Sequence, residues 1–255
     1  MTKDPADKSG KTIDSTWVGP RRSGGQELVF LHEGLGSVSA WRDVPVQIAE
    51  AAGCAAFVYS RAGYGKSSPV EVPRPLTYMH DEAALLPALL AEHSIETPIL
   101  VGHSDGASIA IIAAGSGLPV KALVLIAPHA FVEDVSVASI AKAADAYRTT
   151  DLRDKLGRHH ADVDGAFWGW NRAWLDPEFR KWNVEAFLPR ITAPTLIVQG
   201  AADEYGTLAQ VDAISRQLGG PCEQLIVPGA GHAPHRTAGV PAQIAGFIRQ
   251  QAERA

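Results

Sequence analysis

The chain has 255 residues, of which 46% are hydrophobic and 20% are charged, and its formal net charge is −5. This balance is typical of a folded globular protein rather than a disordered chain, and the length allows one sizeable core with an insertion built onto it. Because the charge is negative and no cluster of lysines or arginines interrupts it, nucleic acid and anionic membranes are not expected as main partners.

Residues 1–12 are expected to form a flexible tail, because Met1 to Lys11 are polar or charged and lack the apolar core of a secretory signal. No uninterrupted apolar run reaches the roughly 18 residues that span a bilayer. We therefore expect a cytoplasmic protein. Its two cysteines, Cys54 and Cys222, make no disulfide framework; we favour free thiols, and a single bridge between them is the alternative.

Short apolar runs alternate with longer helix-like stretches after this tail. Most of these runs are apolar throughout, as expected for strands that are buried on both faces of a parallel sheet. They are Leu28–His32, Ala55–Tyr59, Pro98–Gly102, Ala122–Ala127, Thr195–Gly200 and Gln224–Val227. The alternation predicts an α/β fold with a mostly parallel central sheet flanked by helices and joined by right-handed crossovers.

Three of the intervening helices can be predicted from apolar residues at helical spacing. They cover Asp81–His93, Leu208–Leu218 and Val240–Ala252. The second stops at a pair of glycines, and the third carries Pro241 in its first turn, where a missing N–H costs nothing.

The segment between Ala127 and Thr195 breaks the alternation, because it contains several predicted helices and no convincing strand. We expect residues 129–190 to form a helical cap on a core made of residues 13–128 and 191–255. The segment holds four of the six tryptophans: Trp168, Trp170, Trp174 and Trp182. We expect one or two of them to line a pocket and the others to pack inside the cap.

A G-x-S-x-G sequence, residues 102–106, carries the strongest chemical signal. It follows a predicted strand and precedes a helix of small residues, which is the setting that a nucleophile elbow requires. The turn forces Ser104 into a strained conformation, and glycines on both sides remove the side chains that would clash there. This context predicts that Ser104 is a catalytic nucleophile.

A serine hydroxyl needs a base, and the base needs a group that holds it in the correct tautomer. His232 lies in a glycine-rich loop after the last predicted strand, at the sheet edge where active sites of open α/β sheets lie. His235 is its rival. Asp203 follows the preceding strand and is the predicted orienting carboxylate, with Glu204 as the adjacent alternative. The order Ser104, Asp203, His232 matches that of α/β-hydrolases.

The oxyanion of the reaction needs backbone N–H donors. Asp105, directly after the nucleophile, should supply one of them. Gly34 or Leu35, in the loop after the first clear strand, should supply the other, and the sequence does not choose between them. Glu33 is unusual there, because an ionised carboxylate would oppose a nearby oxyanion. We expect it to point into a hydrogen-bonded network; recognition of a substrate cation is the alternative.

Together these motifs resemble the α/β-hydrolase superfamily, in its capped form, from about Leu28 to the end of the chain. The supporting motifs are the loop 32–36, the segments 60–67 and 193–200, the elbow and the histidine loop. The usual His-Gly before the oxyanion loop is His32-Glu33 here. The segment before Leu28 is also short, so the two leading antiparallel strands of the family reduce to one, around Ile13–Val18.

The resemblance implies a hydrolase and leaves its substrate open. An aspartate at the elbow would indicate a haloalkane dehalogenase or an epoxide hydrolase, and Ser104 excludes both. We expect hydrolysis of a small carboxylic ester, which needs no cofactor and no metal. A C–C bond hydrolase of vinylogous diketones and a non-hydrolytic ligand receptor are the alternatives.

The predicted substrate pocket involves the cap. Trp168 and Trp170 suggest a bulky apolar wall, and Glu33 lies beside the oxyanion loop. His129, at the start of the cap, either faces this pocket or anchors the cap. The sequence predicts neither the identity of the small-molecule substrate nor an oligomeric state.

Overall fold

The computed structural model describes residues 12–254 except positions 20 and 23. The expected flexible tail, residues 1–12, lies outside the described residues except for Thr12.

A seven-stranded sheet runs through the centre of the protein in the order β1-β3-β2-β4-β5-β6-β7. Of the described strands, only β1 is antiparallel to its neighbour, and the others are parallel. Their bounds are β1 Ser15–Val18, β2 Glu27–Leu31, β3 Ala55–Tyr59, β4 Ile99–His103, β5 Ala122–Ile126, β6 Thr195–Gly200 and β7 Cys222–Val227. The predicted fold class, a mostly parallel sheet flanked by helices, is confirmed.

Each predicted strand coincides with an observed one to within two residues. The largest differences are at β1, which begins at Ser15 rather than at Ile13, and at β7, which begins at Cys222 rather than at Gln224. Strand β7 lies at the edge of the sheet, and Glu223 and Gln224 are exposed. Because an edge strand has polar residues at its exposed positions, a search for uninterrupted apolar residues predicts its first residue too late in the chain.

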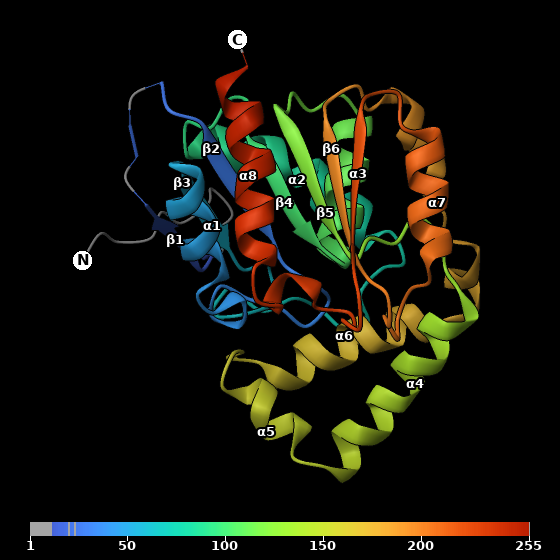
Figure 1. The fold of residues 1–255 in the computed structure, drawn as a ribbon. Coiled ribbons are helices and arrows are strands. Elements are labelled where there is room, and N and C mark those ends of the chain that lie inside the picture. Colours follow the sequence, from blue (N-terminus) through green and yellow to red (C-terminus); the bar gives the residue numbers. More distant parts are fainter. Residues whose placement is uncertain (1–11, 20, 23, 255) are drawn as a thin grey trace.

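Helices cover both faces of the sheet (Figure 1). Helices α1 (Val44–Ala52) and α8 (Val240–Glu253) pack on one face, against the side chains that alternate strand positions direct there. Helices α2 (Tyr78–Glu92), α3 (Asp105–Gly115) and α7 (Leu208–Gln217) pack on the other. Because the inner parallel strands are covered on both sides, their residues are apolar in nearly every position.

Three further helices lie between β5 and β6, and we call them the cap helices: α4 (Asp134–Thr149), α5 (Leu152–Gly157) and α6 (Val163–Leu175). They lie together beyond one end of the sheet (Figure 1). The 3₁₀ turns η2 (Pro177–Lys181) and η3 (Glu185–Arg190) lead back to β6; η1 (Ser39–Trp41) and η4 (Pro234–Arg236) lie in loops of the core.

Two smaller predictions bear on the rest of the chain. Both cysteines are free thiols, as expected. Among the described residues, no helix combines the length and apolar character needed to cross a membrane.

Candidate active site

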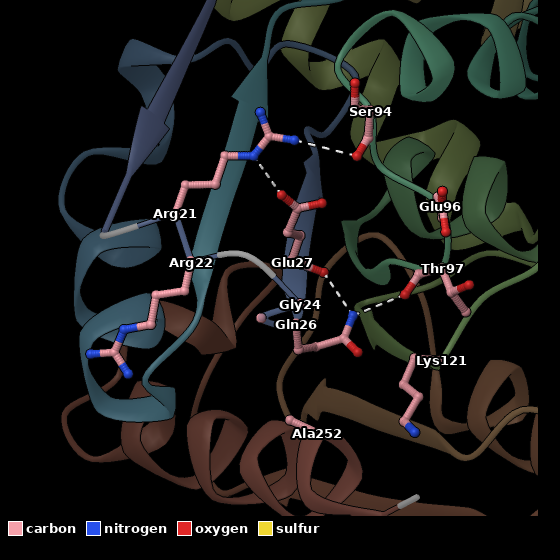
Figure 2. A pocket seen from close by; sticks show the side chains of 11 residues that line it. Arg21, Arg22, Gly24, Gln26, Glu27, Ser94, Glu96, Thr97, Lys121 and Ala252 are labelled. Carbon is pink, nitrogen blue, oxygen red and sulfur yellow. Dashed lines mark hydrogen bonds and ion pairs between the residues drawn. The ribbon is translucent and has the colours of Figure 1, made fainter.

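A polar cleft of about 770 Å³ lies at the amino ends of the strands (Figure 2). Arg21, which lines it, binds the Glu27 carboxylate at 2.6 Å and the Ser94 carbonyl at 3.3 Å. The side chain of Gln26 donates to the Thr97 carbonyl. These groups hold loops together, and no serine–histidine pair lies among the lining residues. The predicted nucleophile lies elsewhere, at the carboxyl end of β4.

Ser104 occupies the turn between β4 and α3 with φ +53° and ψ −118°. This is a conformation that costs free energy for any residue with a side chain. The turn is also tight. A Cβ atom on Gly102 would lie 2.7 Å from Ala107 Cα, and one on Gly106 would lie 2.8 Å from the His32 carbonyl oxygen. Glycine is therefore required at both positions so that strand and helix can approach each other around Ser104.

Ser104, His232 and Asp203 form a continuous hydrogen-bonded chain. The Nε2 atom of His232 lies 2.9 Å from Ser104 Oγ, and its Nδ1 atom lies 2.9 and 3.0 Å from the two carboxylate oxygens of Asp203. Burial alone would raise the pKa of Asp203, but the hydrogen bond from His232 and its charge hold that pKa below its ordinary value. An ionised carboxylate only accepts, so Nδ1 carries the proton and the lone pair on Nε2 faces the serine hydroxyl.

Asp203 is held in place by the backbone and by a side chain of β6. Its Oδ1 atom accepts from the amides of Tyr205 and Gly206, and its Oδ2 atom accepts from the side-chain amide of Gln199. Asp203 is thereby aimed at the imidazole before any substrate binds.

The two rival residues have other contacts. The Glu204 carboxylate accepts from the backbone N–H of His232 at 3.2 Å and does not bind its ring. His235 is fully buried, with its ring 4.6 Å from that of His103 and 5.3 Å from that of Trp41. Neither ring nitrogen of His235 has a hydrogen-bond partner among the described residues. The geometry therefore favours Asp203 and His232.

Replacing His235 with phenylalanine is expected to preserve activity and to weaken the acid sensitivity of the fold. Burial, and secondarily the nearby His103, hold the pKa of His235 well below its ordinary value. Below about pH 6.5 the unfolded chain therefore binds a proton at His235 that the folded chain does not bind. The free energy of unfolding then falls by about 1.4 kcal/mol per pH unit for such a group. Urea unfolding between pH 7 and pH 4.5 should show a shallower slope for His235→Phe; an unchanged slope would contradict the assignment.

The peptide between Glu33 and Gly34 is pinned by three donors. The Glu33 carbonyl oxygen accepts from His32 Nδ1 at 2.7 Å, Arg61 Nη2 at 2.9 Å and the Gly36 amide at 3.0 Å. The N–H of a trans peptide points away from its C=O, so the Gly34 N–H is directed to the opposite side of this cluster. Gly34 and Leu35 both line a cavity together with Ser104. Because the orientation of its peptide is fixed, Gly34 is the candidate that we carry forward as the second oxyanion donor, and Leu35 remains the alternative.

Asp105 begins α3, and its amide has no partner within the helix. It also lies at the positive end of the helix dipole, which favours a developing negative charge. The amides of Gly34 and Asp105 are thus the two candidate donors of the oxyanion hole.

The Glu33 side chain joins the network that sequence analysis favoured. Its Oε2 atom lies 3.3 Å from His103 Nδ1, and His103 Nε2 donates to the His232 carbonyl at 2.7 Å. Burial alone would raise the pKa of Glu33, but the hydrogen bond and charge of His103 hold it well below its ordinary range. Glu33 and His103 thus connect the oxyanion loop to the histidine loop.

The variant Glu33→Gln is expected to unfold more easily at pH 7, by about 1–3 kcal/mol, because a charged hydrogen bond is lost. A depressed carboxyl pKa stabilises the fold above the unfolded value of about 4.3, and this contribution disappears as pH falls through the folded value. The difference from wild type should therefore shrink in urea titrations below about pH 4. Equal stability of the two proteins at pH 7 would argue against the pair.

A cavity of about 120 Å³ lies between Ser104 and the cap helices. It is lined by Glu33, Gly34, Leu35, Ser104, Asp105, His129, Ser136, Ile140, Trp170, Trp174, Tyr205 and His232. Trp170 lies over Gly34 so closely that a side chain on Gly34 would collide with the indole ring. Residues far apart in the sequence thus surround Ser104.

The prediction that Trp168 lines this pocket is wrong. Successive residues of an α-helix turn by about 100°, so Trp168 and Trp170 point to opposite sides of α6, whereas Trp170 and Trp174 share one side. Trp168 instead packs beneath the guanidinium groups of Arg148 and Arg172, 4.8 and 5.6 Å from its ring. Trp182 packs on Phe179 inside the cap segment, with ring centroids 5.5 Å apart.

His129 faces the cavity. Its ring lies 5.2 Å from that of Trp174 and 5.7 Å from that of His232. Burial, and secondarily the charge of His232, lower the pKa of His129 to about 3. His129 is therefore a neutral group in the pocket wall, and its backbone carbonyl also accepts from Ser108 at 2.7 Å.

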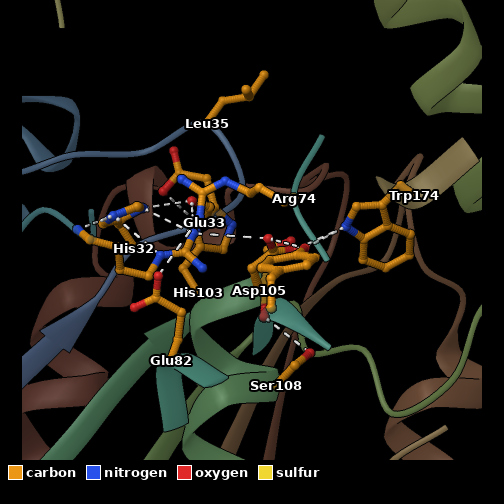
Figure 3. A network of polar contacts seen from close by, with 12 residues as sticks. His32, Glu33, Leu35, Arg74, Glu82, His103, Asp105, Ser108 and Trp174 are labelled. Atoms are coloured by element: carbon orange, nitrogen blue, oxygen red, sulfur yellow. Dashed lines mark hydrogen bonds and ion pairs between the residues drawn. The ribbon is translucent and has the colours of Figure 1, made fainter. Parts of the chain in front are cut away.

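A buried polar network beneath the pocket includes residues that sequence reasoning missed (Figure 3). The Asp105 carboxylate accepts from Tyr78 at 2.6 Å and from the Trp174 indole at 3.3 Å, and Arg61 lies 3.9 Å away. The indole of Trp174 also donates to the Tyr78 hydroxyl at 3.0 Å. The spacing of four residues between Trp170 and Trp174 was the signal that could have identified Trp174.

Within the described part of the chain, no group of three or more His, Cys, Asp or Glu residues is arranged to hold a metal ion.

Sequence and structure comparisons place these observations in a family. The sequence model of the alpha/beta hydrolase family matches residues 28–245, which is most of the chain. The chain therefore belongs to the alpha/beta hydrolase family.

Individual relatives are more distant. A 2-succinyl-6-hydroxy-2,4-cyclohexadiene-1-carboxylate synthase of Salmonella paratyphi C is 34% identical over 100 residues, which cover 39% of this chain and 37% of that enzyme. A carboxylesterase structure from the thaumarchaeon Nitrososphaera gargenis aligns with a TM-score of 0.77 at 16% identity over 96% of this chain and 97% of the other. The hydrolase MGS-M2 from a Medee basin deep-sea metagenome aligns with 0.73 at 20% identity over 96% of both chains. These structural matches show the fold.

Proposed function

We propose that this chain is a carboxylic ester hydrolase that works through an acyl-enzyme on Ser104. The observation that carries the proposal is the hydrogen-bonded chain from Ser104 Oγ through His232 to Asp203, with Ser104 at the wall of a cavity. An activated serine, two backbone donors and a partly apolar pocket are sufficient for ester hydrolysis, and the pathway needs no bound cofactor.

In the proposed reaction, Ser104 Oγ attacks the ester carbonyl carbon while its proton passes to His232 Nε2. The carbonyl oxygen becomes an oxyanion and accepts from the amides of Asp105 and Gly34. His232 then gives the proton to the departing alkoxide, the C–O bond breaks, and the acyl group remains on Ser104. A water molecule that loses its proton to His232 then attacks the acyl-enzyme. The bond between the acyl carbon and Ser104 Oγ breaks, His232 returns the proton to Oγ, and the carboxylic acid leaves.

We further propose that residues 129–190 act as a cap that supplies the pocket wall. Trp170, Trp174 and Ile140 all come from this segment, and all three line the cavity at Ser104. Substrate selection would then depend on the cap, whereas the bond-making groups belong to the core.

The lining of this pocket does not favour the reaction of the synthase relatives. The name of that enzyme describes a compound with a carboxylate group, and burying a carboxylate requires a cationic partner. The described residues that line the cavity include Glu33 and no lysine or arginine.

Product analysis on two substrates tests the proposal. Wild-type protein incubated with p-nitrophenyl acetate should release p-nitrophenol and acetate, with a larger kcat/KM than for cleavage of a ring-fission vinylogous diketone. Efficient cleavage of the diketone without hydrolysis of any ester would overturn the proposal in favour of C–C bond hydrolysis.

A further inference from the structure

The size of the cavity at Ser104 is set by side chains that have little freedom to move. Trp174 is fixed by its indole N–H, which donates to the Tyr78 hydroxyl at 3.0 Å and approaches the Asp105 carboxylate at 3.3 Å. A shift of this ring would leave the buried Asp105 carboxylate with one donor fewer, which is costly. The back of the cavity is therefore rigid.

Trp170 forms the wall above the oxyanion loop. Its ring is buried, lies directly over Gly34 and packs against Phe167, whose ring is stacked on that of Tyr147 with centroids 3.8 Å apart. The aromatic packing inside the cap thus supports Trp170 from behind. Because Trp170 and Ser104 line the same cavity, an acyl chain that is bound on Ser104 Oγ and extends toward this wall would meet the ring.

The space between these walls is small. The cavity measures about 120 Å³, whereas an apolar cavity of about 150 Å³ binds benzene, with its six carbons. An acyl chain of up to about four carbons fits, and a longer chain would have to displace Trp170 or Trp174.

The charge of the lining bears on which acyl groups can bind. Glu33 is among the lining residues, and none of the described residues that line the cavity is a lysine or arginine. The Asp105 carboxylate is buried beneath the cavity, next to Arg61. An acyl group with a second carboxylate would lose its hydration without gaining a cationic partner and would be repelled by Glu33.

We propose that the site takes esters of short, uncharged acyl groups of up to about four carbons, and that Trp170 sets this length limit. The inference rests on the proposed ester hydrolysis at Ser104. It names the acyl group and leaves the alcohol unrestricted.

The test is kcat/KM for p-nitrophenyl acetate, butyrate, hexanoate and octanoate. Wild-type protein should favour acetate or butyrate over octanoate by at least about tenfold, because one misfitting methylene in a pocket changes kcat/KM by about 10- to 200-fold. Trp170→Ala should raise the ratio of hexanoate to butyrate by about tenfold. The mono-p-nitrophenyl ester of succinic acid should react at least about tenfold more slowly than the butyrate.

Trp168→Ala is the matched control, because it removes the same side chain from the opposite side of α6 and should leave the ratios unchanged. Trp170→Leu is a second variant for the case in which the alanine variant fails to fold, as judged by circular dichroism. A wild-type preference for octanoate, or unchanged ratios in folded Trp170 variants, would overturn this inference and leave ester hydrolysis standing. Hydrolysis of no ester, with no covalent labelling of Ser104, would instead overturn the proposed function.

Discussion

Replacing Ser104 with alanine is expected to lower kcat for p-nitrophenyl acetate by roughly 10⁴- to 10⁶-fold while leaving the fold intact. The hydroxyl is the only group of the hydrogen-bonded chain that can form the acyl-enzyme, and the candidate amide donors beside it would retain only a small residual acceleration. The φ of +53° at this position costs free energy for every residue other than glycine. Serine already bears this cost, so alanine introduces no new strain.

The measurement for this variant is steady-state hydrolysis at pH 7, with thermal unfolding as the control for folding. Activity within about tenfold of wild type, in a preparation free of other esterases, would contradict the role of Ser104.

The second large effect is expected at Asp203. In Asp203→Asn, the side-chain amide can present an N–H to His232 Nδ1, which moves the imidazole proton to Nε2 and removes the base that faces Ser104. A loss of about 10⁴-fold in kcat is expected.

Glu204→Gln is the matched control for Asp203→Asn. Glu204 only accepts from the backbone N–H of His232, and a glutamine oxygen can accept in the same way. Its kcat should stay within about tenfold of wild type. A larger loss of kcat in Glu204→Gln than in Asp203→Asn would indicate that Glu204, and not Asp203, orients His232. Burst kinetics with p-nitrophenyl acetate would locate the loss in acylation or deacylation.

The elbow could be predicted from sequence because its requirements are local. A buried strand, a turn with glycine on either side of Ser104 and a helix of small residues are all visible within about fifteen positions of the chain. His232 and Asp203 could be proposed because parallel strands bring their carboxyl ends to one edge of the sheet. Hydrogen-bond geometry was needed to separate them from His235 and Glu204.

The pocket could not be predicted in the same way, because it depends on helix phase and on long-range contacts. Two neighbouring tryptophans look equivalent in the sequence, yet the turn of α6 places only Trp170 against Gly34. The partner of Glu33 is His103, 70 residues away. The choice between Gly34 and Leu35 depends on the direction of one peptide, which is held by His32 within the loop and by Arg61 from outside it.

The central claim is that Ser104 is an activated nucleophile, and intact-mass spectrometry after treatment with a fluorophosphonate probe tests it most directly. Wild-type protein should gain the mass of one phosphonyl group, mapped by peptide analysis to Ser104, and folded Ser104→Ala protein should gain none. Folded wild-type protein that remains unlabelled at Ser104 would contradict the account and favour a ligand receptor built on the same fold.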